Sequence, residues 1–259
     1  MTELKGISRE NRAYWSQRSA GYSDVNRSEL AGVSRAMWKK ALHDRISAHF
    51  GGRPAETVRV LDIGTGPGFF AVILTELGYD VTAIDLTPEM LAEARKNAGD
   101  LADLIDFREM NAEELEFGSG TFDVTVSRNL TWNLPHPEKA YSEWARVLRP
   151  GGLMLNFDSN WYGYLFDEDA MKAYEEDRLN SEALGLGDQN VGENFDVMED
   201  IARRMPLSAT RRPGWDVDVL SGLDMTVSVN ENIWQDVWTH QEQVNFASTP
   251  MFMVHAVRQ

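Results

Sequence analysis

The chain has 259 residues, of which 42% are hydrophobic and 25% charged, the proportions of a folded protein with a sizeable core. Because it has no cysteine, disulfides, thiolate metal sites and a cysteine nucleophile are excluded, and a reducing cytoplasm is the expected location. A formal net charge of -16 argues against a nucleic acid or an anionic membrane as partner, since both need clustered positive charge. The polar N-terminus is unlike a signal peptide, and no run approaches the roughly 18 apolar residues of a membrane span.

Residues 1–52 are expected to form an N-terminal helical cap. Apolar side chains recur at helical spacing between Val33 and Ile46. An earlier helix is expected to carry Tyr14 and Trp15. A pair of glycines then closes the zone, because glycine is a strong helix terminator.

Residues 53–157 alternate short apolar runs with helical patterns, which is typical of a parallel sheet with helices on both faces. The runs expected to form strands are 58–61, 81–84, 104–107, 122–126 and 153–155. Helix starts are predicted at Thr87, which Pro88 follows, and at Pro137. Open parallel sheets bind ligands at the carboxyl ends of their strands, so this zone is the expected binding core.

Two further zones complete the chain. Residues 158–215 are rich in acids and aromatics and are expected to form a helical insertion that covers the ligand edge of the sheet. Residues 216–259 begin with what looks like the end of a helix. They are then expected to close the core with strands near 225–229 and 251–257.

The most distinctive motif is the glycine-rich segment 60–68, Val-Leu-Asp-Ile-Gly-Thr-Gly-Pro-Gly, which directly follows the first expected strand. Glycines allow a tight turn and let a ligand approach the backbone. Alone, the motif is compatible with a bare turn or a dinucleotide site. The dinucleotide pattern requires Gly or Ala at the sixth position from Gly64, where this chain has Phe69. That residue and the preceding acid, Asp62, both argue against a pyrophosphate.

Two polar residues follow the next strands. Asp85 ends the second strand, where a carboxylate can accept hydrogen bonds from both ribose hydroxyls, although it could also cap the helix near Thr87. Its spacing after the glycine motif favours the ribose. Asn111 follows the third strand and can hydrogen-bond an adenine amino group, while the backbone N–H of Ala112 can serve a ring nitrogen. The alternative for Asn111 is an ordinary Asx turn.

Together these motifs resemble those of the class I S-adenosylmethionine (SAM)-dependent methyltransferases, and most closely the small-molecule branch that includes the quinone-biosynthesis enzymes. The matching segments are 62–68, 81–91, 111–117 and 122–152, in that order. The N-terminal aromatic segment from Tyr14 to Tyr22 resembles the one that closes over SAM. The resemblance implies an α/β fold with a Rossmann-like, seven-stranded, mostly parallel sheet, an N-terminal helical cap and a helical insertion after the fifth strand.

The resemblance also implies SAM as cofactor, S-adenosylhomocysteine as product and a small-molecule acceptor. The positions that it assigns to the cofactor are Tyr14, Arg18, Tyr22, Asp62, Gly64, Thr65, Gly66, Asp85, Leu86, Met90, Asn111, Ala112, Glu113, Ser127 and Arg128. Arg128 could pair with the SAM carboxylate or form an ordinary salt bridge. Where many relatives carry two histidines after the fourth strand, this chain has Trp132 and Asn133, so no general base is inherited.

Methyl transfer from a sulfonium needs alignment and exclusion of water, and it needs a base only if the acceptor must lose a proton first. The residues expected to line the acceptor are Trp132, Asn160, Trp161 and Tyr162. The candidate catalytic residues are His136, Asp158 and Arg128. The remaining histidines are scattered and predict no metal site. The aromatic residues leave open an enzyme that cyclises or cleaves SAM, and a non-catalytic SAM-binding regulatory protein is a further alternative.

Overall fold

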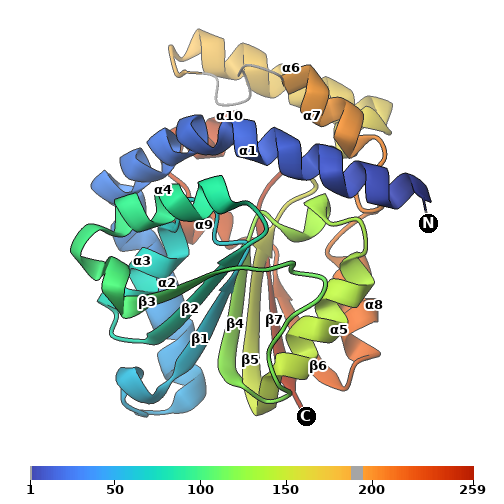
Figure 1. The fold of residues 1–259 in the computed structure, drawn as a ribbon. Coiled ribbons are helices and arrows are strands. Elements are labelled where there is room, and N and C mark those ends of the chain that lie inside the picture. The colour runs from blue at the N-terminus through green and yellow to red at the C-terminus, as the bar shows by residue number, and fades with distance from the viewer. Residues whose placement is uncertain (1, 188–194) are drawn as a thin grey trace.

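The computed structural model describes residues 2–187 and 195–259, and its centre is a single seven-stranded sheet (Figure 1). The strands are β1 (Arg59–Ile63), β2 (Asp80–Asp85), β3 (Ile105–Glu109), β4 (Phe122–Arg128), β5 (Leu148–Asp158), β6 (Met225–Asn230) and β7 (Phe252–Arg258), in the order β3-β2-β1-β4-β5-β7-β6. β7 alone runs antiparallel to its neighbours β5 and β6. The expected Rossmann-like, mostly parallel sheet is confirmed. The strand order reverses between β1 and β4, which places the binding crevice at their carboxyl ends.

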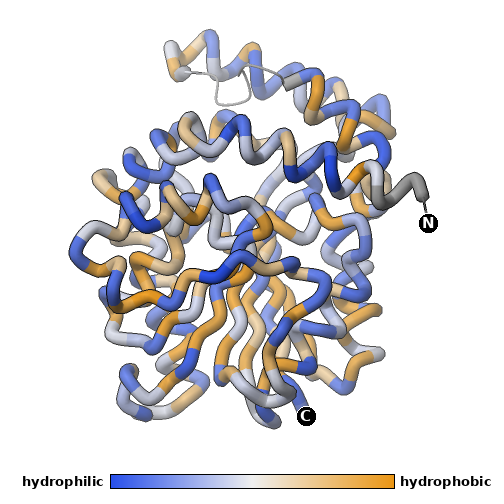
Figure 2. The backbone as a smooth tube through the Cα atoms, viewed as in Figure 1, coloured by the Kyte–Doolittle hydropathy of each residue, from blue (hydrophilic) through white to orange (hydrophobic). Residues whose placement is uncertain are grey.

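Helices cover both faces of this sheet. One layer contains α2 (Val33–Phe50), α3 (Phe69–Glu76), α4 (Pro88–Ala98) and α9 (Trp234–Val237), and the other contains α5 (Pro137–Val147) and α8 (Gly214–Ser221). Successive residues of a strand point to opposite faces, so Val60 packs in the first layer and Leu61 in the second. Figure 2 shows hydrophobic segments concentrated along the strands, where both faces are buried.

A third layer lies over the carboxyl edge of the sheet. α1 (Thr2–Ala31) crosses that edge, and α6 (Glu168–Ala183) and α7 (Phe195–Ala202) lie beyond it (Figure 1). α1 is tied to the sheet edge by Arg12, which pairs with Glu109 of β3 at 2.6 Å, and by Asn11, whose Nδ2 donates to Asn133 O at 3.1 Å. The N-terminal helical cap and the helical insertion are therefore both present. None of the helices in the described ranges combines the length and the apolar character that crossing a membrane requires.

The segment between β6 and β7 differs from the sequence expectation. Only strands were expected there, yet it forms α9 and α10 (His240–Asn245), and α10 packs against α6. A local signal for α10 exists: Thr239 accepts from the Glu242 N–H, while the Glu242 carboxylate accepts from the Thr239 N–H, a complete capping box. Within residues 2–187 and 195–259 there are also four short 3-10 helices: η1 (Ala55–Thr57), η2 (Gly99–Leu104), η3 (Thr131–Asn133) and η4 (Gly163–Leu165).

Candidate active site

The glycine loop after β1 has the backbone geometry that its sequence predicts. Gly64 and Gly66 have φ values of 67° and 53°, a region that side-chain-bearing residues rarely adopt. A Cβ on Gly64 would lie 2.7 Å from a methyl of Leu130, so that side chain would have to shift to admit one. Asp85 fixes this loop, because its Oδ2 accepts from the Gly66 N–H at 2.9 Å and its Oδ1 from the Thr87 N–H at 2.9 Å.

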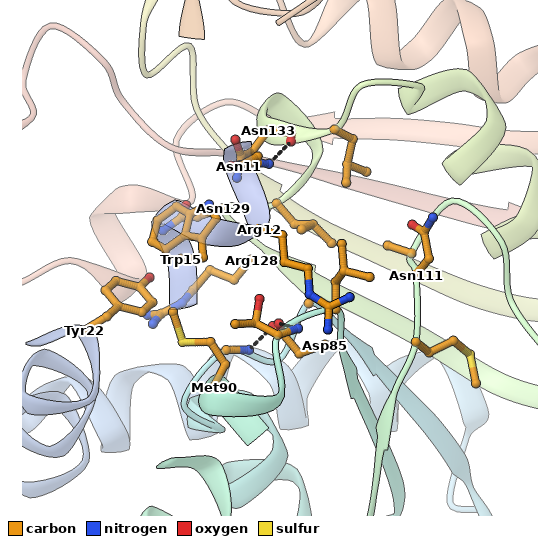
Figure 3. Close-up of a pocket in the computed structure, with 18 residues that line it drawn as sticks. Asn11, Arg12, Trp15, Tyr22, Asp85, Met90, Asn111, Arg128, Asn129 and Asn133 are labelled. Atoms are coloured by element: carbon orange, nitrogen blue, oxygen red, sulfur yellow. Dashed lines mark hydrogen bonds between the residues drawn. The ribbon is translucent and has the colours of Figure 1, made fainter. Parts of the chain in front are cut away.

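A cavity of about 120 Å³, which we call the cofactor cavity, lies at the carboxyl ends of β1, β2, β3 and β4 beneath α1 (Figure 3). Its lining residues are Asn11, Arg12, Trp15, Tyr22, Gly64, Gly66, Asp85, Leu86, Thr87, Met90, Met110, Asn111, Ala112, Arg128, Asn129, Leu130, Asn133 and Leu134. Figure 3 shows Trp15 and Tyr22 on the α1 side and Asn111 on the opposite side. Nine of the fifteen residues that the sequence assigned to the cofactor thus line one cavity.

Two of the predicted residues, Asp62 and Thr65, lie just below this cavity. They line a smaller space of about 30 Å³ together with Tyr22 and Arg128, which belong to both. The Asp62 carboxylate accepts from the Thr65 hydroxyl at 2.6 Å. Burial raises the pKa of Asp62 to about 7, since water is excluded from the carboxylate. Burial also raises the pKa of Asp85, against the lowering effect of its bonds to backbone N–H groups.

Asn111 forms the Asx turn that the sequence offered as one alternative, and it also lies at the cofactor cavity. Its Oδ1 accepts from the Glu113 N–H at 2.9 Å, which is the Asx turn, and the residue also lines the cofactor cavity. Ala112 lies beside it, and the Ala112 carbonyl accepts from the Trp144 indole at 2.9 Å. The turn therefore holds both residues at the cavity wall.

Arg128 forms the salt bridge that the sequence offered as its alternative role. Its two terminal nitrogens donate to the two carboxylate oxygens of Glu29, on α1, at 2.8 and 3.0 Å. The guanidinium also lies 4.4 Å from the centre of the Phe69 ring. Burial opposes the charge of Arg128, but the Glu29 carboxylate outweighs it and raises the pKa of Arg128 above its usual value. The Arg128–Glu29 ion pair joins the end of β4 to α1.

Four predicted cofactor residues lie outside the lining of these spaces: Tyr14, Arg18, Glu113 and Ser127. Ser127 is buried and donates to Asn156 Oδ1 at 2.8 Å. Glu113 accepts from the His136 N–H at 2.7 Å and so holds the start of α5. The Tyr14 ring packs edge-on against the ring of Trp15, which lines the cofactor cavity.

A second cavity, of about 150 Å³, adjoins the first, and we call it the aromatic chamber. Its lining residues are Trp15, Tyr22, Asn129, Trp132, Trp161, Tyr162 and Tyr164. It shares Trp15, Tyr22 and Asn129 with the cofactor cavity. Three of the four residues predicted for the acceptor line it. The fourth, Asn160, instead bonds the backbone of Arg212 through both ends of its carboxamide, at 3.0 Å each.

The sequence did not single out Asn129 and Tyr164. Asn129 follows β4 in the left-handed region, with φ of 56°, and no periodicity or motif predicts that conformation. Tyr164 belongs to η4 in the insertion, and only the tertiary packing turns it toward Tyr162. Trp15, by contrast, belonged to the aromatic segment already expected to close over SAM.

Neither of the candidate bases lines these cavities. Asp158 is fully buried, and its oxygens accept from Arg212 at 2.5 Å, the Trp132 N–H at 3.1 Å and the Ser159 N–H at 2.9 Å. Arg212 in turn pairs with Asp216 at 2.6 Å. His136 is exposed at the start of α5. Asp158 is thus part of a buried ion network, and His136 lines neither cavity.

The chemistry of the cofactor cavity fits SAM. The Asp85 carboxylate at the end of β2 suits a ribose. The left-handed glycines of the loop let a ligand approach the backbone, and Leu86 and Met90 offer an apolar wall to an adenine.

Comparison with known proteins shows which proteins this chain resembles. Residues 61–156 match the family described as a methyltransferase domain. A solved geranyl diphosphate C-methyltransferase from Streptomyces coelicolor A3(2), in complex with S-adenosyl-L-homocysteine, shares the fold with a TM-score of 0.54 and 13% identity, over 85% of this chain and 79% of that one. The chain thus carries a methyltransferase domain and resembles the class I SAM-dependent methyltransferases, for which SAM is the cofactor.

Within this class the chain is similar to methyltransferases of small molecules. It is 37% identical over 138 residues to a phosphatidylethanolamine N-methyltransferase from Cereibacter sphaeroides, a match that covers 48% of this chain and 66%, just under two thirds, of that protein. It is 28% identical over 225 residues to a ubiquinone/menaquinone biosynthesis C-methyltransferase from Roseobacter denitrificans, covering 83% of this chain and 86% of that protein. The predicted resemblance to the quinone-biosynthesis branch is confirmed.

Proposed function

We propose that this chain transfers the methyl group of SAM to a small molecule held in the aromatic chamber. The observation that carries the proposal is that the two cavities share Trp15, Tyr22 and Asn129, so an acceptor in the chamber would face the ligand in the cofactor cavity. Acceptor and donor could then meet without passing through solvent.

Each part of SAM has a proposed partner. Asp85 would hold the ribose, Asn111 and Ala112 the adenine edge, and Asp62 the amino group. These residues come from the ends of β1, β2 and β3, which surround the cavity. Arg128 would stay paired with Glu29 and act as a positioning residue that holds α1 over the site.

When bound, SAM supplies an activated methyl group on a positively charged sulfur. The protein's task is alignment and exclusion of water, and α1 performs the second by laying Asn11, Trp15 and Tyr22 over the cavity. The rings of the chamber would also favour the positive charge, because the faces of aromatic rings attract cations. A proton has to leave only where the acceptor atom must lose one before or during the transfer.

We also propose a small molecule, rather than a nucleic acid, as acceptor and the cytoplasm as location. A net charge of -16 disfavours binding to phosphate backbones. Six of the seven residues that line the chamber are aromatic, which suits an apolar ring. A chain without cysteine suits a reducing compartment.

Calorimetry with SAM, S-adenosylhomocysteine and NAD, followed by product analysis, tests the proposal. We expect micromolar binding of the two adenosyl ligands and none of NAD. In turnover we expect S-adenosylhomocysteine and a methylated product. Methylthioadenosine without methylated product would instead support SAM cleavage, and binding without turnover on any acceptor would support a regulatory role.

A further inference from the structure

The aromatic chamber is enclosed almost entirely by ring surface. Six of its seven lining residues are aromatic, and they come from α1, from η3, from the loop after β5 and from η4. Those that the rest of the chain leaves partly uncovered are Trp15, Tyr22, Trp161 and Tyr162. A ligand in the chamber would therefore meet ring surface from several separate elements.

The rings are inclined to one another rather than stacked flat. The centres of the Trp132 and Tyr162 rings lie 4.8 Å apart with 39° between their planes, and those of Tyr162 and Tyr164 lie 6.0 Å apart with 37°. On the α1 side the rings of Trp15 and Tyr22 lie 5.6 Å apart with 60° between them. The face of an aromatic ring attracts a cation, and clusters of such rings are typical of sites that bind alkylated ammonium groups.

The lining offers little to a group that needs hydrogen bonds. None of its seven residues is an aspartate, glutamate, histidine, lysine or arginine. A primary ammonium would bring three N–H donors into a space lined mostly by ring carbon, and burying a polar group without a partner is costly. A nitrogen that carries only carbon substituents has no N–H and needs no acceptor. The lining therefore favours a fully alkylated ammonium over a primary one.

A negative charge lies directly behind the rings. The Tyr164 hydroxyl donates to the carboxylate of Glu199, on α7, at 2.8 Å. Burial is the main reason that the pKa of Tyr162 is raised, and Glu199 raises this pKa further by more than Arg18 lowers it. The field of the Glu199 carboxylate thus reaches the chamber and outweighs that of Arg18, so it adds to the attraction of the rings for a cation.

We propose, resting on the proposed function, that the acceptor atom is the nitrogen of a tertiary amine and that the chamber binds the quaternary ammonium that the transfer produces. The amine enters as its free base, after its proton has passed to water. Its lone pair forms the new N–CH₃ bond while the S–CH₃ bond breaks and leaves its electron pair on sulfur. The positive charge passes from sulfur to nitrogen, and the product carries no N–H.

This assignment accounts for the position of the candidate bases. Neither Asp158 nor His136 lines the cavities. A hydroxyl or carbon acceptor would have to lose a proton before or during the transfer, whereas the free base of a tertiary amine has none to lose. The chain's task is then to favour positive charge at the nitrogen as it develops, and the rings supply that attraction without a base.

The binding test compares (3-hydroxybenzyl)trimethylammonium with its uncharged isostere 3-neopentylphenol on the S-adenosylhomocysteine complex. The two compounds differ only in the quaternary atom, which is nitrogen in one and carbon in the other. Binding is followed by tryptophan fluorescence, since Trp15, Trp132 and Trp161 line the chamber. We expect the cation to bind about tenfold more tightly. Equal binding, tighter binding of the isostere, or binding of neither would overturn the proposal.

The transfer test uses SAM with 3-(dimethylaminomethyl)phenol, which offers a tertiary nitrogen and a phenolic oxygen in one molecule. We expect methylation at nitrogen alone, and none of the matched primary amine 3-(aminomethyl)phenol. Methylation at oxygen, methylation of the primary amine, or no transfer to either compound would contradict the assignment. A chain that binds neither SAM nor S-adenosylhomocysteine would instead overturn the proposed function.

Two variants at Trp161, which lines the chamber but not the cofactor cavity, separate the attraction of the ring from packing. Trp161→Leu keeps apolar bulk without a ring, so affinity for the cation should fall about tenfold while affinity for 3-neopentylphenol is kept. Trp161→Phe keeps a ring and should lose only about threefold. Calorimetry with S-adenosylhomocysteine should match the wild type in both variants, which shows that they are folded. An equal loss for cation and isostere in Trp161→Leu would mean that packing alone provides the binding, and the proposal would fail.

Discussion

The cofactor cavity and the aromatic chamber are built in different ways. The first stands on the carboxyl ends of neighbouring parallel strands, with polar groups such as Asp85 fixed by backbone hydrogen bonds. The second is enclosed mainly by aromatic rings from α1 and the insertion, which meet only in the tertiary structure. The comparison teaches that donor recognition belongs to the sheet, whereas acceptor recognition depends on how the helices pack over it.

The largest expected effect concerns the buried ions that fix the insertion to the sheet. Arg212→Met would leave Asp158 and Asp216 buried without their cation, so the free energy of unfolding should fall by about 3–5 kcal/mol. Urea denaturation measures this. Arg211→Met, at the exposed neighbouring position, is the control and should change little. A similar loss in both variants would contradict the role of the network.

A change confined to the cofactor cavity should affect SAM and leave the fold in place. In Asp85→Ala, loss of the carboxylate that would hold the ribose should weaken SAM binding about 100-fold in calorimetry. Asp80→Ala, at the exposed amino end of the same strand, is the matched control. Undiminished binding in Asp85→Ala would remove the ribose assignment, and a loss in Asp80→Ala would point to a general effect on β2.

A change confined to the aromatic chamber should affect use of the acceptor and leave SAM binding in place. Trp161→Ala removes one ring of the chamber, so kcat/KM for the methylated acceptor should fall about tenfold while SAM affinity is kept. Steady-state kinetics and calorimetry on the same preparation separate the two quantities. If SAM affinity fell in parallel, the two cavities would not be independent.

The smallest expected effect concerns the link between the regions. Glu29→Gln breaks the ion pair with Arg128, so α1 should close less firmly and SAM should dissociate about fivefold faster in stopped-flow measurements. Glu10 lies on the same helix as Glu29 and forms an exposed ion pair with Arg204. Glu10→Gln breaks that pair and should leave the SAM dissociation rate unaltered. Equal rates in wild type and Glu29→Gln would show that the pair does not hold α1 closed.

Much of the cofactor side was predictable from the sequence. The glycine loop, Asp85 and Asn111 each follow an apolar run, and the ends of parallel strands meet at one edge. The roles of single side chains were less predictable. Asp158 was a candidate base because it ends β5 at the carboxyl edge of the sheet. Its carboxylate instead pairs with Arg212, 54 residues further along the chain. Asn160 likewise serves the backbone of Arg212 rather than the chamber.

The sequence by itself determined the class of fold and the outline of the cofactor cavity, because those features depend on periodicity and on short contiguous motifs. Only the tertiary structure decided that Glu29, 99 residues away, pairs with Arg128, and that rings from α1 and the insertion meet to enclose the chamber. Such contacts arise where α1, the end of β4 and the insertion converge, and no local pattern encodes the distances between segments so far apart in the chain.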